Sequence, residues 1–164
     1  MAEITDRVAE PATIPDVHAG TGRAEERDAV EFVHRRWRAD AGELGAIRRE
    51  LGRWIAPLGL ADEEVADVVL AVDEATANVV QHAYPAGDTG DVELTLWTEP
   101  GALCIEVVDH GSWQGADQPG RGIELMQSMV GAVLIHVDER GSRVLLRHPL
   151  PLTDEVPGRH RADF

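Results

Sequence analysis

Hydrophobic residues recur at helical spacing in two stretches of the central part of the chain. The first stretch follows Asp40 and Glu43, whose spacing is that of a capping box and predicts a helix start. Pro57 and Gly59 mark its end. Apolar residues three or four positions apart predict a face that packs on a core: Leu44, Ile47, Leu51, Trp54, Ile55 and Leu58.

The second stretch predicts a longer helix that Asp62 caps and Pro85 ends. Glu63 and Glu64 lie in its first turn, where the helix dipole favours negative charge. Its core face is predicted to comprise Val65, Val68, Val69, Val72, Thr76, Val79, Val80 and Ala83. Both helices are therefore expected to cover the same core.

Alternation of apolar and polar residues indicates strands in the rest of the chain. The predicted strands are 30–38, 92–98, 102–108, 133–138 and 143–147. The first is expected to be an edge strand that buries Phe32 and Trp37, and a short helix is expected at 123–130. With short hairpins between neighbouring strands, this order predicts an α+β two-layer sandwich: a mixed, mostly antiparallel sheet with helices on one face.

The 164 residues, 43% of them hydrophobic, fit one globular domain with two tails. Residues 1–28 hold prolines, glycines and many charges without periodicity, which predicts a disordered N-terminal tail. The domain is expected to span 29–150, and 151–164 form a C-terminal tail. Within the domain, 109–120 show no regular pattern, and a connection of this length indicates a functional loop or lid.

The chain is acidic, with a formal net charge of −15, and it contains no lysine. Residues 30–150 carry 20 acidic residues against 10 arginines, so the acidity belongs to the domain and not only to its tails. Such a surface repels nucleic acid and anionic lipid and favours basic patches on protein partners. Any phosphate chemistry must rely on arginine, backbone N–H groups and a metal ion.

The chain shows no sign of export or membrane insertion. It has no apolar run near the about 20 residues of a membrane span, and acidic residues occupy the N-terminus where a signal peptide is basic. A cytoplasmic location is therefore expected. Cys104 is the only cysteine, which excludes an intrachain disulfide, and its strand position predicts a buried small side chain.

Glu74, Asn78 and His82 are each four residues apart on the second predicted helix. At about 100° per residue they form one stripe along the border of the apolar face, where polar groups can line a crevice. A carboxylate there can take the proton of a hydroxyl that attacks phosphorus, and an amide can complete the shell of Mg²⁺. A solvated helix flank with a hydrogen-bonding histidine explains the same stripe.

Two further segments carry candidate chemistry. Asp109 ends a strand and Gly111 follows soon after. This pair fits an ordinary turn. It also fits a carboxylate that accepts the exocyclic N–H of a nucleotide base, with a glycine that lets the backbone approach the ring. Gly120, Arg121 and Gly122 open the helix at 123–130. Free N–H groups and the positive end of the helix dipole favour an anion there, although a flexible turn has the same composition.

Together these segments resemble the GHKL (Bergerat-fold) ATPase superfamily and, within it, the bacterial anti-sigma-factor serine/threonine kinases. The resemblance spans residues 37–150. Residues 74–84 are similar to the family's E-A-x-x-N-x-x-x-H-A-Y N-box, and residues 120–126 to its G-R-G-L-x-L-M box. The order of the segments along the chain also agrees with the family.

The resemblance implies that Glu74 is the catalytic base, Asn78 the Mg²⁺ ligand and Asp109 the adenine acceptor. The implied ATP site comprises Asn78, His82, Asp109, Gly111, Gly120, Arg121, Gly122 and Ile123, the last four around the phosphates. The implied partners are a STAS-domain anti-anti-sigma protein, phosphorylated on serine or threonine, and an RNA polymerase sigma factor. Family members are often homodimers.

One position departs from the family pattern. The D-x-G-x-G box here reads Asp109-His110-Gly111-Ser112-Trp113, so a tryptophan replaces the second glycine. Trp113 either clashes with the nucleotide or stacks near its base. This change leaves a rival open: a non-catalytic anti-sigma or STAS-binding module in which nucleotide is structural or absent.

Glu74 favours the kinase, because a pure binding module needs no base. The ATPase half of a sensor histidine kinase is disfavoured. Residues 1–40 are too short and too poor in heptads to supply a phosphoacceptor helical hairpin.

Overall fold

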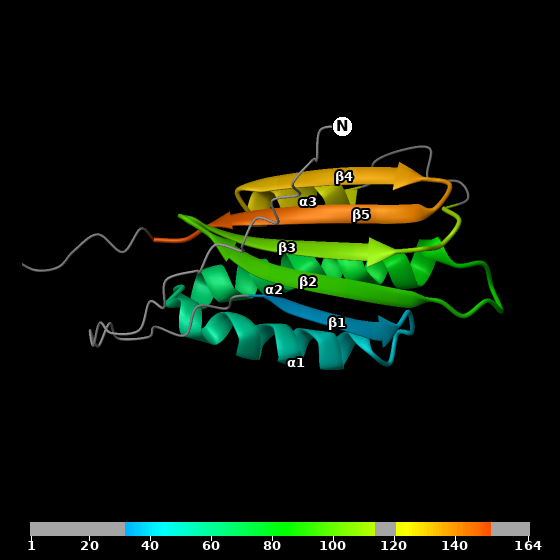
Figure 1. Ribbon diagram of the computed structural model, residues 1–164, viewed down its shortest axis with the longest axis horizontal. Helices are drawn as coiled ribbons and strands as arrows, with labels where there is room; N and C mark the ends of the chain where they lie inside the picture. The colour runs from blue at the N-terminus through cyan, green and yellow to red at the C-terminus, as the bar shows by residue number, and fades with distance from the viewer. Residues whose placement is uncertain (1–31, 114–120, 152–164) are drawn as a thin grey trace, which may run out of the picture.

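The computed structural model describes residues 32–113 and 121–151, and within them one sheet carries helices on one face (Figure 1). The strands are β1 (Val33–Arg38), β2 (Asp91–Glu99), β3 (Ala102–Asp109), β4 (Ala132–Asp138) and β5 (Gly141–Pro149). The helices are α1 (Leu44–Ile55), α2 (Asp62–Asn78) and α3 (Arg121–Met129), with a 3-10 turn η1 (Ala56–Leu58) and a π turn η2 (Val79–Ala83).

The strands lie in the order β1-β2-β3-β5-β4, and every pairing between described strands is antiparallel. The expected α+β two-layer sandwich is confirmed. No parallel pair occurs among these strands, so the mixed character expected for the sheet is absent from the described part. The predicted tail 1–28, nearly all of the tail 151–164, and residues 114–120 of the predicted lid lie outside the described residues.

The core lies between the sheet and its helices. Alternation along β2, β3 and β5 turns one apolar set toward α2: Leu94, Leu96, Ile105, Val107, Val144 and Leu146. Most of the predicted helix faces are buried, including Ile47, Leu51 and Ile55 of α1. The sequence interpretation missed Ala71 and Ala75, which are fully buried because small side chains let α2 lie close to the sheet.

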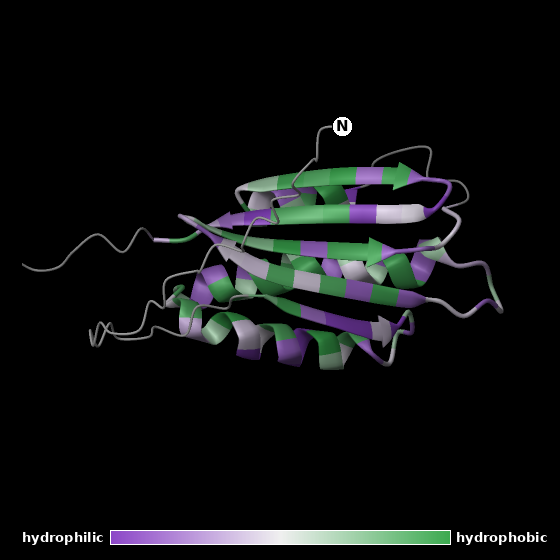
Figure 2. Ribbon diagram, in the orientation of Figure 1, coloured by the Kyte–Doolittle hydropathy of each residue, from purple (hydrophilic) through white to green (hydrophobic). Residues whose placement is uncertain are grey.

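The predicted burial of Phe32 is wrong, whereas that of Trp37 is confirmed in part. Phe32 precedes β1 and is 66% exposed, while Trp37 is half-buried against the core and lies 6.0 Å from Trp54 between ring centroids. Phe32 lies outside the strand, and even a longer β1 could not turn both residues to one face, because positions 32 and 37 are an odd number of residues apart. Hydrophilic residues dominate β1 and the start of β2, and hydrophobic ones dominate β3 and β4 (Figure 2).

Both predicted helix caps are displaced. The Asp40 carboxylate accepts the Gly42 N–H at 2.7 Å in a local turn, so it is not available to cap α1, which begins only at Leu44. At α2 the capping residue is Ala61 and not Asp62, and Glu64 accepts the Ala61 N–H at 2.8 Å. This contact is half of a capping box, since alanine has no side-chain acceptor.

Cys104 is buried as predicted, at 2% exposed. Burial raises the pKa of its thiol, and the negative charge of Glu99 adds to the effect. Within residues 32–113 and 121–151, no helix combines the length and the apolar character that crossing a bilayer requires.

Candidate functional site

The end of α2 meets the start of α3 at Gly122. A Cβ at Gly122 would overlap Oε1 of Glu74 and lie 3.3 Å from Nδ2 of Asn78. Glu74 and Asn78 are half-buried and one helical turn apart, so both side chains face the first turn of α3. The contact brings together two segments more than forty residues apart in sequence, and a side chain at position 122 would displace the Glu74 carboxylate from it.

The neighbouring carboxylate of Asp73 faces α1 and pairs with an arginine. Nη1 of Arg48 on α1 donates to both of its oxygens, at 3.0 and 3.2 Å. A rotation of about 100° per residue turns Glu74 away from α1 and toward α3. Among the described residues the Glu74 carboxylate has no hydrogen-bond or ion-pair partner.

The helix changes its winding immediately after Asn78, in the π turn η2. The predicted stripe assumed constant α-helical rotation, which holds for Glu74 and Asn78 but not through this turn. His82 is consequently exposed, and its ring lies 6.2 Å from that of Trp113 between centroids. The structure places His82 beside Trp113, whereas the side chains nearest Gly122 are those of Glu74 and Asn78.

Asp109, the last residue of β3, is 1% exposed, and three donors form hydrogen bonds with its carboxylate. Its carboxylate accepts the Gly111 N–H at 2.9 Å, the Trp113 Nε1–H at 3.0 and 3.1 Å, and the Ser142 hydroxyl. Ser142 was missed because only the register of β3 with β5, which pairs it with Asp109, brings it to the site. The motif alone contains no signal for it.

Gly111 has a packing role that the sequence did not indicate. A Cβ at this position would overlap the carbonyl oxygen of Ala83, the last residue of η2. The glycine therefore allows the chain after β3 to lie directly on the end of the π turn, which holds Asp109 near the end of the N-box segment.

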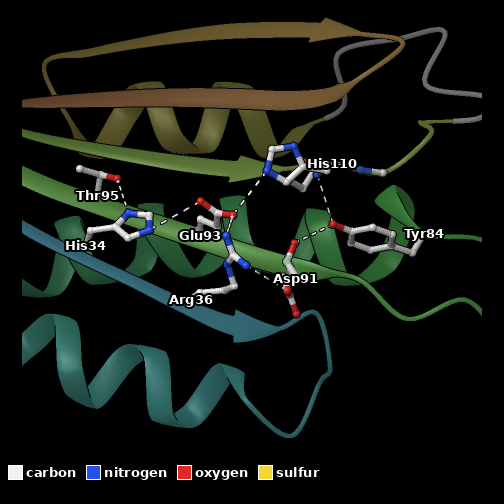
Figure 3. Close-up of polar contacts among 9 residues, drawn as sticks. His34, Arg36, Tyr84, Asp91, Glu93, Thr95 and His110 are labelled. Atoms are coloured by element: carbon white, nitrogen blue, oxygen red, sulfur yellow. Dashed lines mark hydrogen bonds and ion pairs between the residues drawn. The ribbon is translucent and has the colours of Figure 1, made fainter.

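Tyr84 connects the end of η2 to the strands beside it through hydrogen bonds (Figure 3). Its hydroxyl donates to the Asp91 carbonyl at 2.6 Å and accepts the His110 N–H at 3.2 Å. Burial is the largest cause of the raised pKa of Tyr84, so the hydroxyl stays protonated and able to donate at neutral pH. Tyr84 thus fixes the chain after η2 to the start of β2 and the end of β3.

Replacing Tyr84 by phenylalanine is expected to lower the free energy of unfolding by about 1 kcal/mol, the usual net worth of a hydrogen bond. The Asp91 carbonyl and the His110 N–H would each lose their partner. Urea denaturation followed by circular dichroism measures the change. Phe32→Leu, at an exposed position, is the control, and an unchanged midpoint for Tyr84→Phe would contradict the assignment.

A second polar cluster surrounds Glu93, on the face of the sheet opposite the helices (Figure 3). Arg36 lies 2.7 Å from its carboxylate, His110 lies 3.4 Å and His34 3.6 Å away. The sheet separates this cluster from Glu74 and Asn78. It is therefore not part of the candidate site.

The remaining predicted residues lie around the start of α3. Arg121 is exposed at its first position, whereas Ile123 is half-buried and packs against the core, so its side chain has a structural role. Gly120 lies outside the described residues. Residues 32–113 and 121–151 contain no group of three or more His, Cys, Asp or Glu side chains placed to hold a metal ion.

Comparison with known proteins identifies the family. Residues 37–148, more than half of the chain, match the family described as the histidine kinase-like ATPase domain. The chain belongs to this family. Membership implies ATP binding, and it confirms the superfamily to which the sequence motifs pointed.

Relatives of this ATPase domain include bacterial regulators. The chain is 26% identical over 129 residues to the serine-protein kinase RsbW of Bacillus licheniformis, covering 67% of this chain and 81% of the relative. It is 25% identical over 116 residues to the anti-sigma F factor of Clostridium botulinum, covering 61% of this chain and 81% of the relative. These similarities confirm the resemblance to anti-sigma-factor serine kinases.

A solved structure shares the fold. The RsbU and RsbW domains of a Mycobacterium tuberculosis protein match with a TM-score of 0.62 and 24% identity. The match covers 73% of this chain and 32% of that longer chain.

Proposed function

We propose that this protein is an ATP- and Mg²⁺-dependent serine/threonine kinase that acts as an anti-sigma factor. Its proposed substrate is a STAS-domain anti-anti-sigma protein, and it alternates between that protein and an RNA polymerase sigma factor. The observation that carries the proposal is the contact of Gly122 with Glu74 and Asn78. This contact sets a carboxylate and an amide against a helix N-terminus, an arrangement suited to phosphoryl transfer.

Glu74 is proposed to accept the proton of the substrate hydroxyl as its oxygen attacks the γ-phosphate of ATP. Two features support this role: the carboxylate has no partner among the described residues, and it faces the helix start that would hold phosphate. The first N–H groups of α3, at Arg121, Gly122 and Ile123, have no partner within the helix and are proposed to bind phosphate oxygens.

The Asn78 amide is proposed to hold Mg²⁺ together with ATP phosphate oxygens. The residues fit this ion because Mg²⁺ in phosphoryl-transfer sites keeps several waters and takes few protein ligands, so no larger cluster is required. When bound, the ion neutralises charge that develops on the phosphate oxygens. At the other end of the site, the buried carboxylate of Asp109 is proposed to accept the exocyclic amine of adenine.

Replacing Asn78 by alanine is expected to weaken binding of Mg²⁺–ATP about 10- to 100-fold, the range seen when support of a metal site is lost. Calorimetric titration at saturating Mg²⁺ measures the affinity. Gln81→Ala, which removes an exposed amide from the next turn, is the control and should bind as the wild type does. Equal affinities for wild type and Asn78→Ala would remove Asn78 from the site.

The proposed activity is tested by incubating the protein with γ-labelled ATP, Mg²⁺ and candidate STAS proteins. Transfer of label to one of them, lost when its acceptor serine or threonine is replaced by alanine, is the expected result. Stable binding of a sigma factor or STAS protein without transfer would instead support the second candidate, a non-catalytic binding module. The hydrogen bond from Trp113 to Asp109 is the observation that favours this alternative.

A further inference from the structure

Trp113 stands where the family box has its second glycine, and its side chain is directed at Asp109, the proposed adenine acceptor. Its indole N–H donates to Oδ1 of Asp109 at 3.0 Å and to Oδ2 at 3.1 Å. The ring also lies 6.2 Å from His82 between centroids, at an interplanar angle of 42°. The indole therefore lies between the strand-end carboxylate and the N-box segment.

The three donors to Asp109 differ in how firmly the fold holds them. Gly111 is fixed by its close approach to Ala83, and Ser142 by strand pairing. Trp113 belongs to no helix or strand, and its side chain is only half-buried. Of the three, the indole is the donor that a ligand can displace without breaking the sheet.

The indole also matches an adenine base in chemistry. Each is a flat, bicyclic aromatic ring that offers an N–H donor at its edge, and Trp offers only a donor. Hydrogen bonds to a charged carboxylate are stronger than those between neutral groups, and Asp109 already accepts bonds from three donors. An adenine amine needs the same oxygens, so the two rings compete for one acceptor.

We propose that Trp113 is an intramolecular competitor of adenine: its indole occupies Asp109 in the nucleotide-free protein, and ATP binds by displacing it. The proposal rests on the proposed function, in which Asp109 is the adenine acceptor. This chain then binds nucleotide more weakly than a variant that has glycine at position 113. The sequence left two possibilities: Trp113 clashes with the nucleotide, or it stacks near the base. The hydrogen bond from Trp113 to Asp109 favours the clash.

The test is a calorimetric titration of Mg²⁺–ATP into the wild type, Trp113→Phe and Trp113→Gly. Trp113→Phe removes the N–H but keeps a ring, and Trp113→Gly restores the family pattern. Hydrogen bonds to charged groups have a net worth that corresponds to about 10- to 100-fold in affinity. We therefore expect ATP to bind about 10-fold or more tightly to Trp113→Phe than to the wild type, and more tightly still to Trp113→Gly.

Trp97→Phe is the matched control. Its indole also donates to a carboxylate, that of Glu99 at 3.2 Å, but on the face of the sheet opposite the helices. This variant should bind ATP as the wild type does. A second measurement uses the wild type itself: ATP should red-shift tryptophan emission and increase its quenching by acrylamide, and Trp113→Phe should lack this change.

The possible failures are distinguishable. If the wild type binds ATP and both Trp113 variants bind it equally or more weakly, the indole stacks on the base or is neutral, and the inference is overturned while the proposed ATP site stands. If no variant binds ATP, Trp113→Gly included, both the inference and the proposed site fail. Emission that is unchanged by saturating ATP in the wild type also overturns displacement.

Discussion

Replacing Glu74 by alanine is expected to slow phosphotransfer about 10²- to 10⁴-fold, the usual contribution of a general base, with ATP still bound. Glu74→Gln, which keeps the shape against Gly122 but cannot take a proton, should be similarly slow. Single-turnover transfer of label to the substrate protein measures the rate, and calorimetry measures ATP affinity. A loss of rate without a loss of affinity identifies a group that acts in the chemical step.

The adjacent residue offers a matched control for Glu74. Asp73→Asn alters a carboxylate of the same helix turn, but one that Arg48 already binds. This variant is expected to retain its transfer rate and to lose at most a small part of its stability, because exposed ion pairs contribute about 0 to 1 kcal/mol. Wild-type turnover in Glu74→Ala would remove Glu74 from the role of base.

Replacing Gly122 by alanine is expected to weaken Mg²⁺–ATP binding about 5-fold or more, because crowding the Asn78 amide costs about 1 kcal/mol, the low end of the range for overpacking. The new Cβ would overlap Oε1 of Glu74 and crowd the Asn78 amide, so the carboxyl end of the flexible Glu74 side chain must turn away and the Asn78 amide must shift slightly. The transfer rate should fall as well, since the base is displaced. Calorimetric titration and the label-transfer assay measure the two effects.

Gly52→Ala is the control for helix propensity at Gly122. Gly52 also lies within a helix, but a Cβ there meets nothing within 4 Å. Alanine at position 52 should leave ATP binding unchanged and raise stability by about 0.5–1 kcal/mol, because glycine is unfavourable inside helices. Wild-type affinity in Gly122→Ala would show that the close contact has no part in nucleotide binding.

Much of the fold was predictable because it depends on local periodicity. Helical spacing located α1 and α2 and most of their buried faces, and alternation located the strands to within a few residues. The predictions were wrong where a residue could adopt either of two local arrangements. Asp40 bonds to Gly42 and does not cap α1, and Phe32 lies outside the strand to which its hydrophobicity assigned it.

The candidate site was predictable only in its parts. Glu74 and Asn78 share a helix face because four residues make about one turn, and sequence spacing is sufficient to show it. Their contact with Gly122 depends on how α3 packs against α2. The π turn that moves His82 toward Trp113 has no sequence signal of comparable strength.

The sequence by itself determined the family and the order of helices and strands, and it supplied the candidate residues for the proposed phosphoryl transfer. Tertiary structure alone decided which of those residues meet: Gly122 with Glu74 and Asn78, and Asp109 with Ser142 and Trp113. The reason is physical. Backbone rotation repeats over a few residues and is visible in any short window, whereas a contact between distant segments depends on strand register and helix packing.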